Sequence, residues 1–225
     1  AQKNLDMQKF RNLIISYPPL EEQKRIVAKL DAVFGEIDKA IEIETKQLDN
    51  YEVLESLVLD KYMLNKSWPE YKFGDYYDVR DGTHDSPKYV SEGYPLITSK
   101  NLKEGKITFS KIKYISKTDY TLINKRSKVD IGDVLFAMIG TIGNPVEVKE
   151  KPNFAIKNVA LFKLKEIQSP RFLTYLLRTP FYKKKFIDDA RGTTQKFVSL
   201  GYLREFIFNC PSIEDQESII KKLDV

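Results

Sequence analysis

The chain has 225 residues, of which 42% are hydrophobic and 31% charged, a balance typical of one well-cored domain plus an additional element. It contains no apolar run near the roughly 20 residues that a membrane span needs, and no signal-peptide pattern, so a cytoplasmic protein is expected. Because there is one cysteine and one histidine, an internal disulfide and a cysteine-based zinc site are excluded, and no metal or cofactor is expected.

Charge is unevenly distributed along the chain, whose net charge is +5. Residues 21–61 contain eleven acidic and six basic side chains, a net of −5, so the remainder must have a net of +10. This division suggests an acidic part that faces proteins and a basic part that faces a polyanion such as nucleic acid. A basic protein with no nucleic-acid role would show the same net charge.

The two ends of the chain repeat each other at an offset of 193 residues. Residues 1–32 overlap residues 194–225 without a gap, and eleven of these 32 positions are identical, from Gln2-Lys3 over Gln195-Lys196 to Asp31 over Asp224. The match is tightest where Pro18–Gln23 lies over Pro211–Gln216. The sequence is therefore interpreted as one period of a tandem repeat followed by the start of the next.

Each copy of the repeat predicts a strand that leads into a helix. The apolar residues 13–15 and 206–208 are expected to be strands, and each is followed by a proline that suits a strand exit or a first helical turn. Carboxylates come next, at positions 21–22 and 214–215, where the dipole of a helix N-terminus favours negative charge.

A long helix is predicted from residue 20 to residue 65, a stretch with no proline and one glycine. Apolar residues recur at coiled-coil spacing, so the helix needs a partner, supplied by the second copy of the repeat or by a second chain. A helix folded back on its own domain is the alternative. The expected seam consists of Ile26, Leu30, Val33, Ile37, Tyr51, Leu54 and Val58.

Residues 68–211 predict an α+β domain whose sheet is mostly antiparallel and resembles a Greek key or a barrel. Expected strands lie near 71–79, 95–99, 106–115, 133–139, 146–150, 155–164 and 204–209. Helices are expected near 119–122 and over 170–190, the second beginning after Ser169-Pro170, a good N-cap and first-turn pair.

Four polar loops between these elements contain the candidate DNA-binding residues. They are rich in Arg, Lys, Asn, Gln, Ser and Thr, the side chains that read base edges. Polar glycine-containing loops are also ordinary turns, and His84 could equally be a hydrogen-bonded turn residue. The candidates are Arg80, Asp81, Thr83, His84 and Lys88; Ser99, Lys100 and Asn101; Thr141 and Asn144; and Arg191, Thr193, Thr194, Gln195 and Lys196. Lys184, in a run of three lysines, is a candidate phosphate contact, although a solvated helix face explains it too.

Enzyme signatures are weak. Asn144-Pro145-Val146 lacks the second proline and the aromatic residue of an adenine methyltransferase loop, and no phosphate-binding Gly-x-x-x-x-Gly-Lys motif occurs. The acidic pairs at 188–189 and 214–215 are better explained by capping or solvation than by metal binding, and Cys210 is expected in the core.

Together these motifs resemble the specificity subunits of type I restriction–modification enzymes. The resemblance rests on the duplicated Pro-Pro-Leu-Glu-Glu-Gln segment and on an ordered set of motifs: Asp81–His84, Pro95–Ile97, Gly132–Phe136, Ile139–Gly143 and Gly192–Lys196. It covers nearly the whole chain.

The resemblance implies a non-catalytic subunit that reads half of a bipartite site in double-stranded DNA and assembles with methyltransferase and, in the nuclease form, restriction subunits. A coiled-coil scaffold without specific DNA binding is the alternative. The implied domains are the tail of a preceding recognition domain (1–19), a spacer helix (20–66), a target recognition domain (67–211) and the start of a second conserved helix (212–225). With one complete recognition domain, the chain would read a palindromic site as a homodimer.

Overall fold

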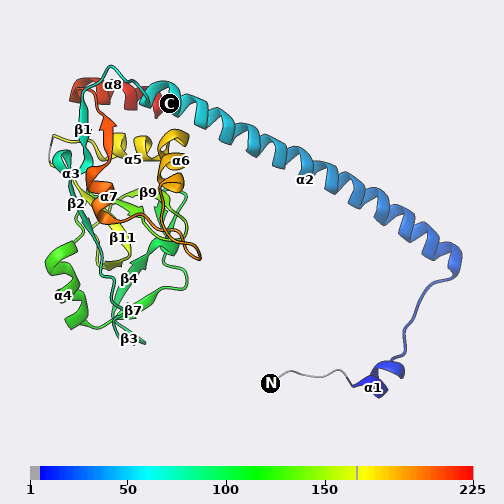
Figure 1. The fold of residues 1–225 in the computed structure, drawn as a ribbon. Coiled ribbons are helices and arrows are strands. Elements are labelled where there is room, and N and C mark those ends of the chain that lie inside the picture. Colours follow the sequence, from blue (N-terminus) through cyan, green and yellow to red (C-terminus); the bar gives the residue numbers. More distant parts are fainter. Residues whose placement is uncertain (1–5, 166, 225) are drawn as a thin grey trace. The chain divides into compact units, whose positions relative to one another are not determined.

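The structure is a computed structural model that describes residues 6–165 and 167–224 (Figure 1). The repeat matches at Gln2 and Lys3 lie outside these residues. The chain divides into two compact units, Ala1–Val53 and Leu54–Val225, which are described separately below.

The first unit contains a short helix, α1 (Met7–Arg11), and most of a long one, α2 (Leu20–Met63). At 44 residues α2 is about 66 Å long, in agreement with the predicted long helix. Its first turn is stabilised by Gln23, whose side chain donates to the Pro18 carbonyl at 2.7 Å. Glu22 accepts two hydrogen bonds from Arg25, which lower the pKa of its carboxyl group. The strand expected at residues 13–15 is not formed.

The seam of α2 is largely exposed. Ile26, Leu30 and Val33 are 37%, 46% and 48% exposed, Ile37 is 47% exposed, and Tyr51 is 67% exposed. Leu54 and Val58, at the start of the second unit, are exposed and half-buried. A stripe of large apolar side chains in water would leave a helix of this length only marginally stable, so the exposed seam is the face that the predicted partner helix would cover.

The second unit is built around two four-stranded sheets (Figure 1). One has the order β2 (Asp78–Asp81), β11 (Val159–Lys163), β8 (Val134–Ala137) and β9 (Gly143–Glu147), and all of its pairs are antiparallel. The other has the order β10 (Ala155–Lys157), β4 (Tyr94–Thr98), β7 (Lys113–Ile115) and β3 (Tyr89–Val90). In it only the β10–β4 pair is parallel. The predicted α+β class with a mostly antiparallel sheet is therefore confirmed.

Two further antiparallel pairs join β1 (Glu70–Lys72) to β12 (Ile207–Asn209) and β5 (Leu102–Lys103) to β6 (Lys106–Ile107). The remaining helices are α3 (Phe73–Tyr76), η1 (Ser99–Asn101), α4 (Lys117–Ser127), α5 (Pro170–Arg178), α6 (Pro180–Asp188), α7 (Leu200–Glu205) and α8 (Ile213–Leu223). Ser or Thr side chains cap the N-termini of α4 to α8, which explains where these helices begin.

Several predicted elements differ from the structure in their boundaries. The strand expected at 71–79 is interrupted by α3, because Phe73 turns into the core, where it is fully buried. The helix expected over 170–190 is divided into α5 and α6, since Thr179 ends the first and caps the second, with Pro180 at its first position. The strand expected at 204–209 is shorter, because α7 extends to Glu205.

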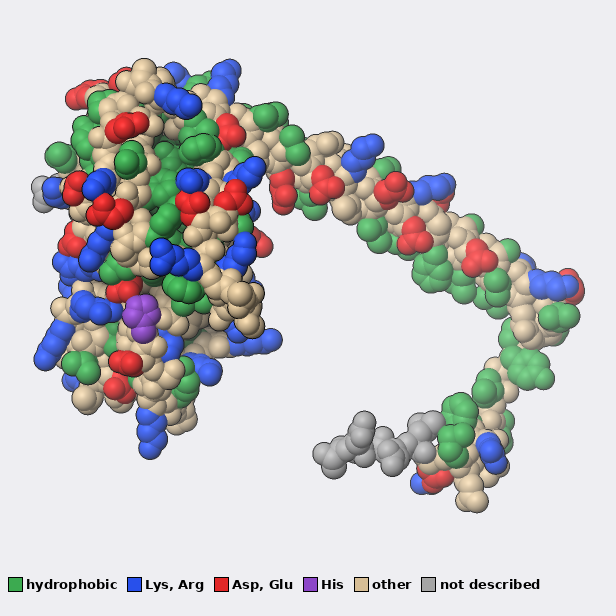
Figure 2. Space-filling model, in the orientation of Figure 1, with side chains coloured by type: hydrophobic (Ala, Val, Ile, Leu, Met, Phe, Trp, Pro, Cys, Tyr) green, Lys and Arg blue, Asp and Glu red, His purple; other side chains and the backbone are tan. Residues whose placement is uncertain are grey.

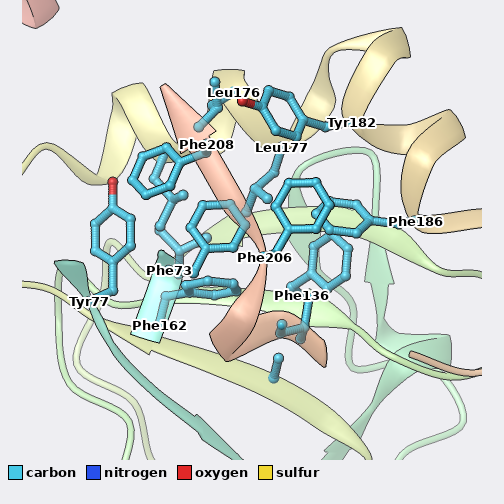
Figure 3. Close-up of a cluster of buried hydrophobic side chains, with 14 of the residues drawn as sticks. Phe73, Tyr77, Phe136, Phe162, Leu176, Leu177, Tyr182, Phe186, Phe206 and Phe208 are labelled. Atoms are coloured by element: carbon cyan, nitrogen blue, oxygen red, sulfur yellow. The ribbon is translucent and has the colours of Figure 1, made fainter. Parts of the chain in front are cut away.

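The main core is rich in aromatic rings that come from distant parts of the sequence (Figure 3). Phe73 packs against Phe208 with ring centroids 4.5 Å apart, and Phe186 packs against Phe206 at 4.7 Å. Phe206 and Phe208 flank Ile207 in the segment that pairs with β1. This pairing joins the last strand of the domain to its first strand. Cys210 is buried in this core, as expected.

Candidate nucleic-acid interface

The first polar loop leaves β2 and is anchored by its own acidic residue. The Asp81 side chain is only 7% exposed; one of its oxygens lies 2.9 Å from an Arg126 guanidinium nitrogen, and the other accepts from His84 Nε2 at 2.7 Å. The same Arg126 nitrogen donates to the backbone carbonyls of Asp81 and Gly82. At Gly82 a side chain would lie 2.3 Å from the Ile156 carbonyl oxygen, so this close approach to β10 requires glycine.

Lys157, the last residue of β10, and Asn158, which connects β10 to β11, hold the rest of this loop. Lys157 donates to the carbonyls of His84 (3.2 Å) and Asp85 (2.8 Å) and to the Ser86 hydroxyl (2.7 Å). Asn158 has a positive φ of 54°; its backbone N–H donates to Thr83, and its side-chain Oδ1 lies 2.9 Å from His84 Nδ1. Asparagine tolerates this left-handed conformation better than most residues. The loop is thus tied to the sheet at several points.

The second loop is a single turn, η1, whose polar side chains mostly stabilise the turn itself. Asn101 accepts from the backbone and hydroxyl of Thr98 at 3.0 and 2.9 Å and donates to the Thr108 carbonyl. The Ser99 hydroxyl donates to the Asn158 carbonyl at 3.1 Å. Both Ser99 and Asn101 are buried, whereas Lys100 is exposed between them.

The third and fourth loops are hydrogen-bonded to each other. Gly140, at φ +74°, donates its backbone N–H to the Lys196 carbonyl at 3.1 Å. Arg191 and Phe197 exchange two backbone hydrogen bonds, of 2.9 and 2.8 Å, which close the fourth loop. Asn144 donates to the Leu102 carbonyl and so connects the third loop to the second.

Two cavities show that the four loops meet on one side of the domain. A cavity of about 500 Å³ is lined by residues of the second, third and fourth loops, among them Ser99, Lys100, Asn101, Ile139 and Gln195. A second cavity, of about 540 Å³, is lined by Asp81 and His84 of the first loop, by Ile139 of the third loop and by residues 197–201, which follow the fourth loop. Ile139 and Asn158 line both cavities.

The candidate residues fall into three groups in this arrangement. Asp81, Ser99 and Asn101 are buried and hydrogen-bonded within the protein, and Arg80 is held by Asp78, whose pKa this contact lowers. Thr83 and Asn144 are half-buried. Exposed side chains are those of His84, Lys88, Lys100, Thr141, Arg191, Thr193, Thr194, Gln195 and Lys196. Lys184 is exposed on α6 and lines neither cavity.

The first cavity is also lined by lysines that lie outside the four polar loops. Lys103, Lys111 and Lys113 line it beside Lys100. Lys113 lies over the Tyr89 ring, with its ammonium 4.3 Å from the ring centroid, a cation–π contact. Lys and Arg side chains are spread over the visible face of this unit, interspersed with acidic and apolar side chains (Figure 2). Arg126, Lys157 and Asn158 were also missed, because their roles depend on long-range contacts.

This architecture defines a class of protein in which an α+β domain with converging polar loops is joined in sequence to a long helix whose apolar face is largely exposed. The family model "Type I restriction modification DNA specificity domain" matches residues 1–49 and 65–225. The chain belongs to this family.

Curated relatives and solved structures agree with this assignment. The chain is 23% identical over 99% of its length to the EcoBI specificity subunit of Escherichia coli, covering 53% of that protein. It is 25% identical over 98% of its length to the MjaVIII specificity subunit of Methanocaldococcus jannaschii, covering 56% of it. The chain therefore spans about half the length of the curated relatives it matches.

Among solved structures, the HsdS subunit from Thermoanaerobacter tengcongensis has 20% identity and a TM-score of 0.55, over 92% of this chain and 51% of that one. A chain from a structure on complex assembly and conformational transition of the type I R-M system gives a TM-score of 0.66 at 21% identity. That alignment covers 92% of this chain and 52% of the other. At these identities the likeness shows the fold.

Proposed function

We propose that this chain reads the base sequence of double-stranded DNA as one recognition half of a type I restriction–modification complex. The observation that carries the proposal is the convergence of four polar loops around two adjoining cavities, in a chain of the DNA specificity family. A coiled-coil scaffold without DNA binding would not need these loops on one side of the domain.

Affinity and specificity have different sources in this proposal. Exposed lysines at the rim of the first cavity, such as Lys100 and Lys103, contact phosphates and give sequence-independent, salt-sensitive binding. Exposed loop side chains, such as Thr141 and Gln195, contact base edges in a groove. The buried residues Asp81, Ser99 and Asn101 fix the loop conformations instead of reaching bases.

The remainder of the chain serves assembly. Residues 1–19 are proposed as the tail of a preceding recognition domain, 20–66 as the spacer helix, 67–211 as the target recognition domain and 212–225 as the start of the second conserved helix. The exposed seam of α2 accepts a partner helix, either from a further repeat or from a second copy of the chain. Modification subunits, and restriction subunits in the nuclease form, would supply the chemistry, so this chain is proposed to be non-catalytic.

A library selection tests the proposal. The chain, alone and mixed with its modification subunit, would be bound to a randomised DNA duplex at two salt concentrations, and the retained duplexes sequenced. Enrichment of one short motif, or of two copies at fixed spacing, is the expected result. Salt-sensitive binding with no enrichment would reduce the chain to a generic basic scaffold and refute the proposal.

A further inference from the structure

Two residues outside the four loops, Lys157 and Asn158, are placed to control the shape of the first loop. They follow one another at the end of β10, and Lys157 pairs with Thr83 in a parallel bridge. The Asn158 backbone N–H donates to the Thr83 carbonyl at 3.1 Å, and the Thr83 N–H donates to the Ile156 carbonyl at 3.1 Å. The backbone of the first loop is therefore hydrogen-bonded to the end of β10.

The Lys157 ammonium donates its hydrogen bonds within the protein, although it is a basic group close to the proposed DNA-binding loops. Its three contacts, to the carbonyls of His84 and Asp85 and to the Ser86 hydroxyl, have distances between 2.7 and 3.2 Å. An ammonium group has three donors, so these contacts match its full capacity. Lys157 is thus equipped to hold the turn of the loop and has no donor left for a phosphate.

Asn158 connects the first loop to the second. Its side chain lies 2.9 Å from His84, and its carbonyl accepts from the Ser99 hydroxyl at 3.1 Å. His84 in turn contacts Asp81, which Arg126 holds, so the imidazole is fixed at both ring nitrogens. Asn158 also lines both cavities. Movement of its side chain would change the position of His84 relative to Lys100.

We infer that Lys157 and Asn158 are positioning residues that set sequence preference by fixing the first loop against the second, without themselves gripping DNA phosphates. The inference rests on the proposed DNA-reading function. A reading loop held within a fraction of an ångström discriminates between bases, whereas a loose loop binds many sequences with similar affinity.

Two variants separate positioning from phosphate binding. Lys157→Met keeps an unbranched side chain of similar size but removes the ammonium donors. Asn158→Gly removes the amide while glycine keeps the left-handed backbone. Glu104→Gly is the matched control, because Glu104 also has a positive φ (49°), is exposed, and lines neither cavity. Lys100→Ala is the control for the loss of a phosphate contact.

Each full-length variant would be titrated, over a range of salt concentrations, with the duplex selected by the wild-type chain and with single-base variants of it. Both positioning variants are expected to lose about tenfold of the preference for the selected duplex, with an unchanged salt dependence. Lys100→Ala should keep the preference and lower the slope of log K against log salt by about 1. Lys157→Arg, which restores donors for the same carbonyls, should recover part of the preference.

Three results would overturn the inference. If Lys157→Met lowers the salt slope by about 1 and keeps the preference, Lys157 is a phosphate contact. If Lys157→Met and Asn158→Gly keep wild-type preference while their circular dichroism and unfolding midpoints match the wild-type chain, neither residue positions the loop. If the wild-type chain itself selects no motif, the proposed function fails first, and the inference fails with it.

Discussion

Asp6 and Ser199, which stand 193 residues apart, perform the same task in the two copies of the repeat. Asp6 accepts backbone hydrogen bonds from Gln8 and Lys9 at the start of α1, and Ser199 accepts one from Tyr202 at the start of α7. The first residues of α2 and α8, Leu20 and Ile213, are also 193 positions apart. The duplication seen in the sequence is therefore also seen in where these helices begin, although residues 13–15 form no strand to match β12.

The two copies differ in what covers them, and this difference predicts the effect of matched substitutions. Phe208 is 1% exposed in the aromatic core, whereas its repeat equivalent Ile15 is 69% exposed. Phe208→Ala should lower the free energy of unfolding by about 3–5 kcal/mol, and Ile15→Ala by less than about 0.5 kcal/mol, in urea denaturation. Similar losses for both would contradict the difference in burial between Phe208 and Ile15.

The exposed seam predicts association through α2. Leu30→Glu places a carboxylate in the proposed interface and should raise the dissociation constant at least about tenfold in sedimentation experiments. The unfolding midpoint of the second unit should not change, because Leu30 is already 46% exposed. Lys46→Glu introduces the same residue outside the seam and should associate like the wild-type chain. Equal effects of the two substitutions would assign the result to charge alone.

The aromatic core predicts a loss of stability at alkaline pH. Burial raises the pKa of Tyr182 to about 12 from its usual 10, while a hydrogen bond with the Asn209 backbone acts in the opposite direction. Between pH 10 and 12 the unfolded chain loses the phenol proton that the folded chain retains, so stability falls as pH rises. The contribution is about 2–3 kcal/mol, fully present below pH 10.

Tyr182→Phe, which removes this titration, should therefore lose about 2 kcal/mol less than the wild-type chain between pH 9 and 12. Urea denaturation at each pH measures the difference. Tyr17→Phe is the control, because it removes the same hydroxyl from a side chain that is 78% exposed. Parallel stability curves for the wild-type chain and Tyr182→Phe would show that Tyr182 ionises alike in the folded and unfolded states.

The two proposed kinds of DNA contact predict different responses to alanine substitution. Gln195 is exposed and lines the first cavity, so Gln195→Ala should change the preferred base at one position, at a cost of about 1–3 kcal/mol on the selected duplex. Lys184→Ala should weaken binding to all sequences alike. Fluorescence anisotropy on the selected and substituted duplexes separates these effects. Identical responses of the two variants would refute the division between base contacts and phosphate contacts.

Much of the fold can be predicted from local sequence patterns, but the candidate interface depends on contacts between residues far apart in the sequence. The periodicity of residues 20–65 predicts α2, and Ser169-Pro170 predicts the start of α5, because caps and helical spacing are local signals. The break between α5 and α6 at Thr179 also has a local signal, because Pro180 follows Thr179. However, the apolar pattern of the sequence continues past Thr179 and predicts one helix. By contrast, residue type alone makes Asp81 a candidate base contact, and only its pairing with Arg126, 45 positions away, shows why it is buried.

The central claim is that the four polar loops face DNA. Protein–DNA crosslinking from defined positions is the most direct test of it. A photoreactive amino acid would be placed at Thr141 or Thr194, which are exposed in the third and fourth loops, or at Lys221, which is exposed on α8. The complex with the selected duplex would then be irradiated. The account predicts DNA adducts from the two loop positions and none from Lys221. Adducts from Lys221 with none from the loops would contradict it.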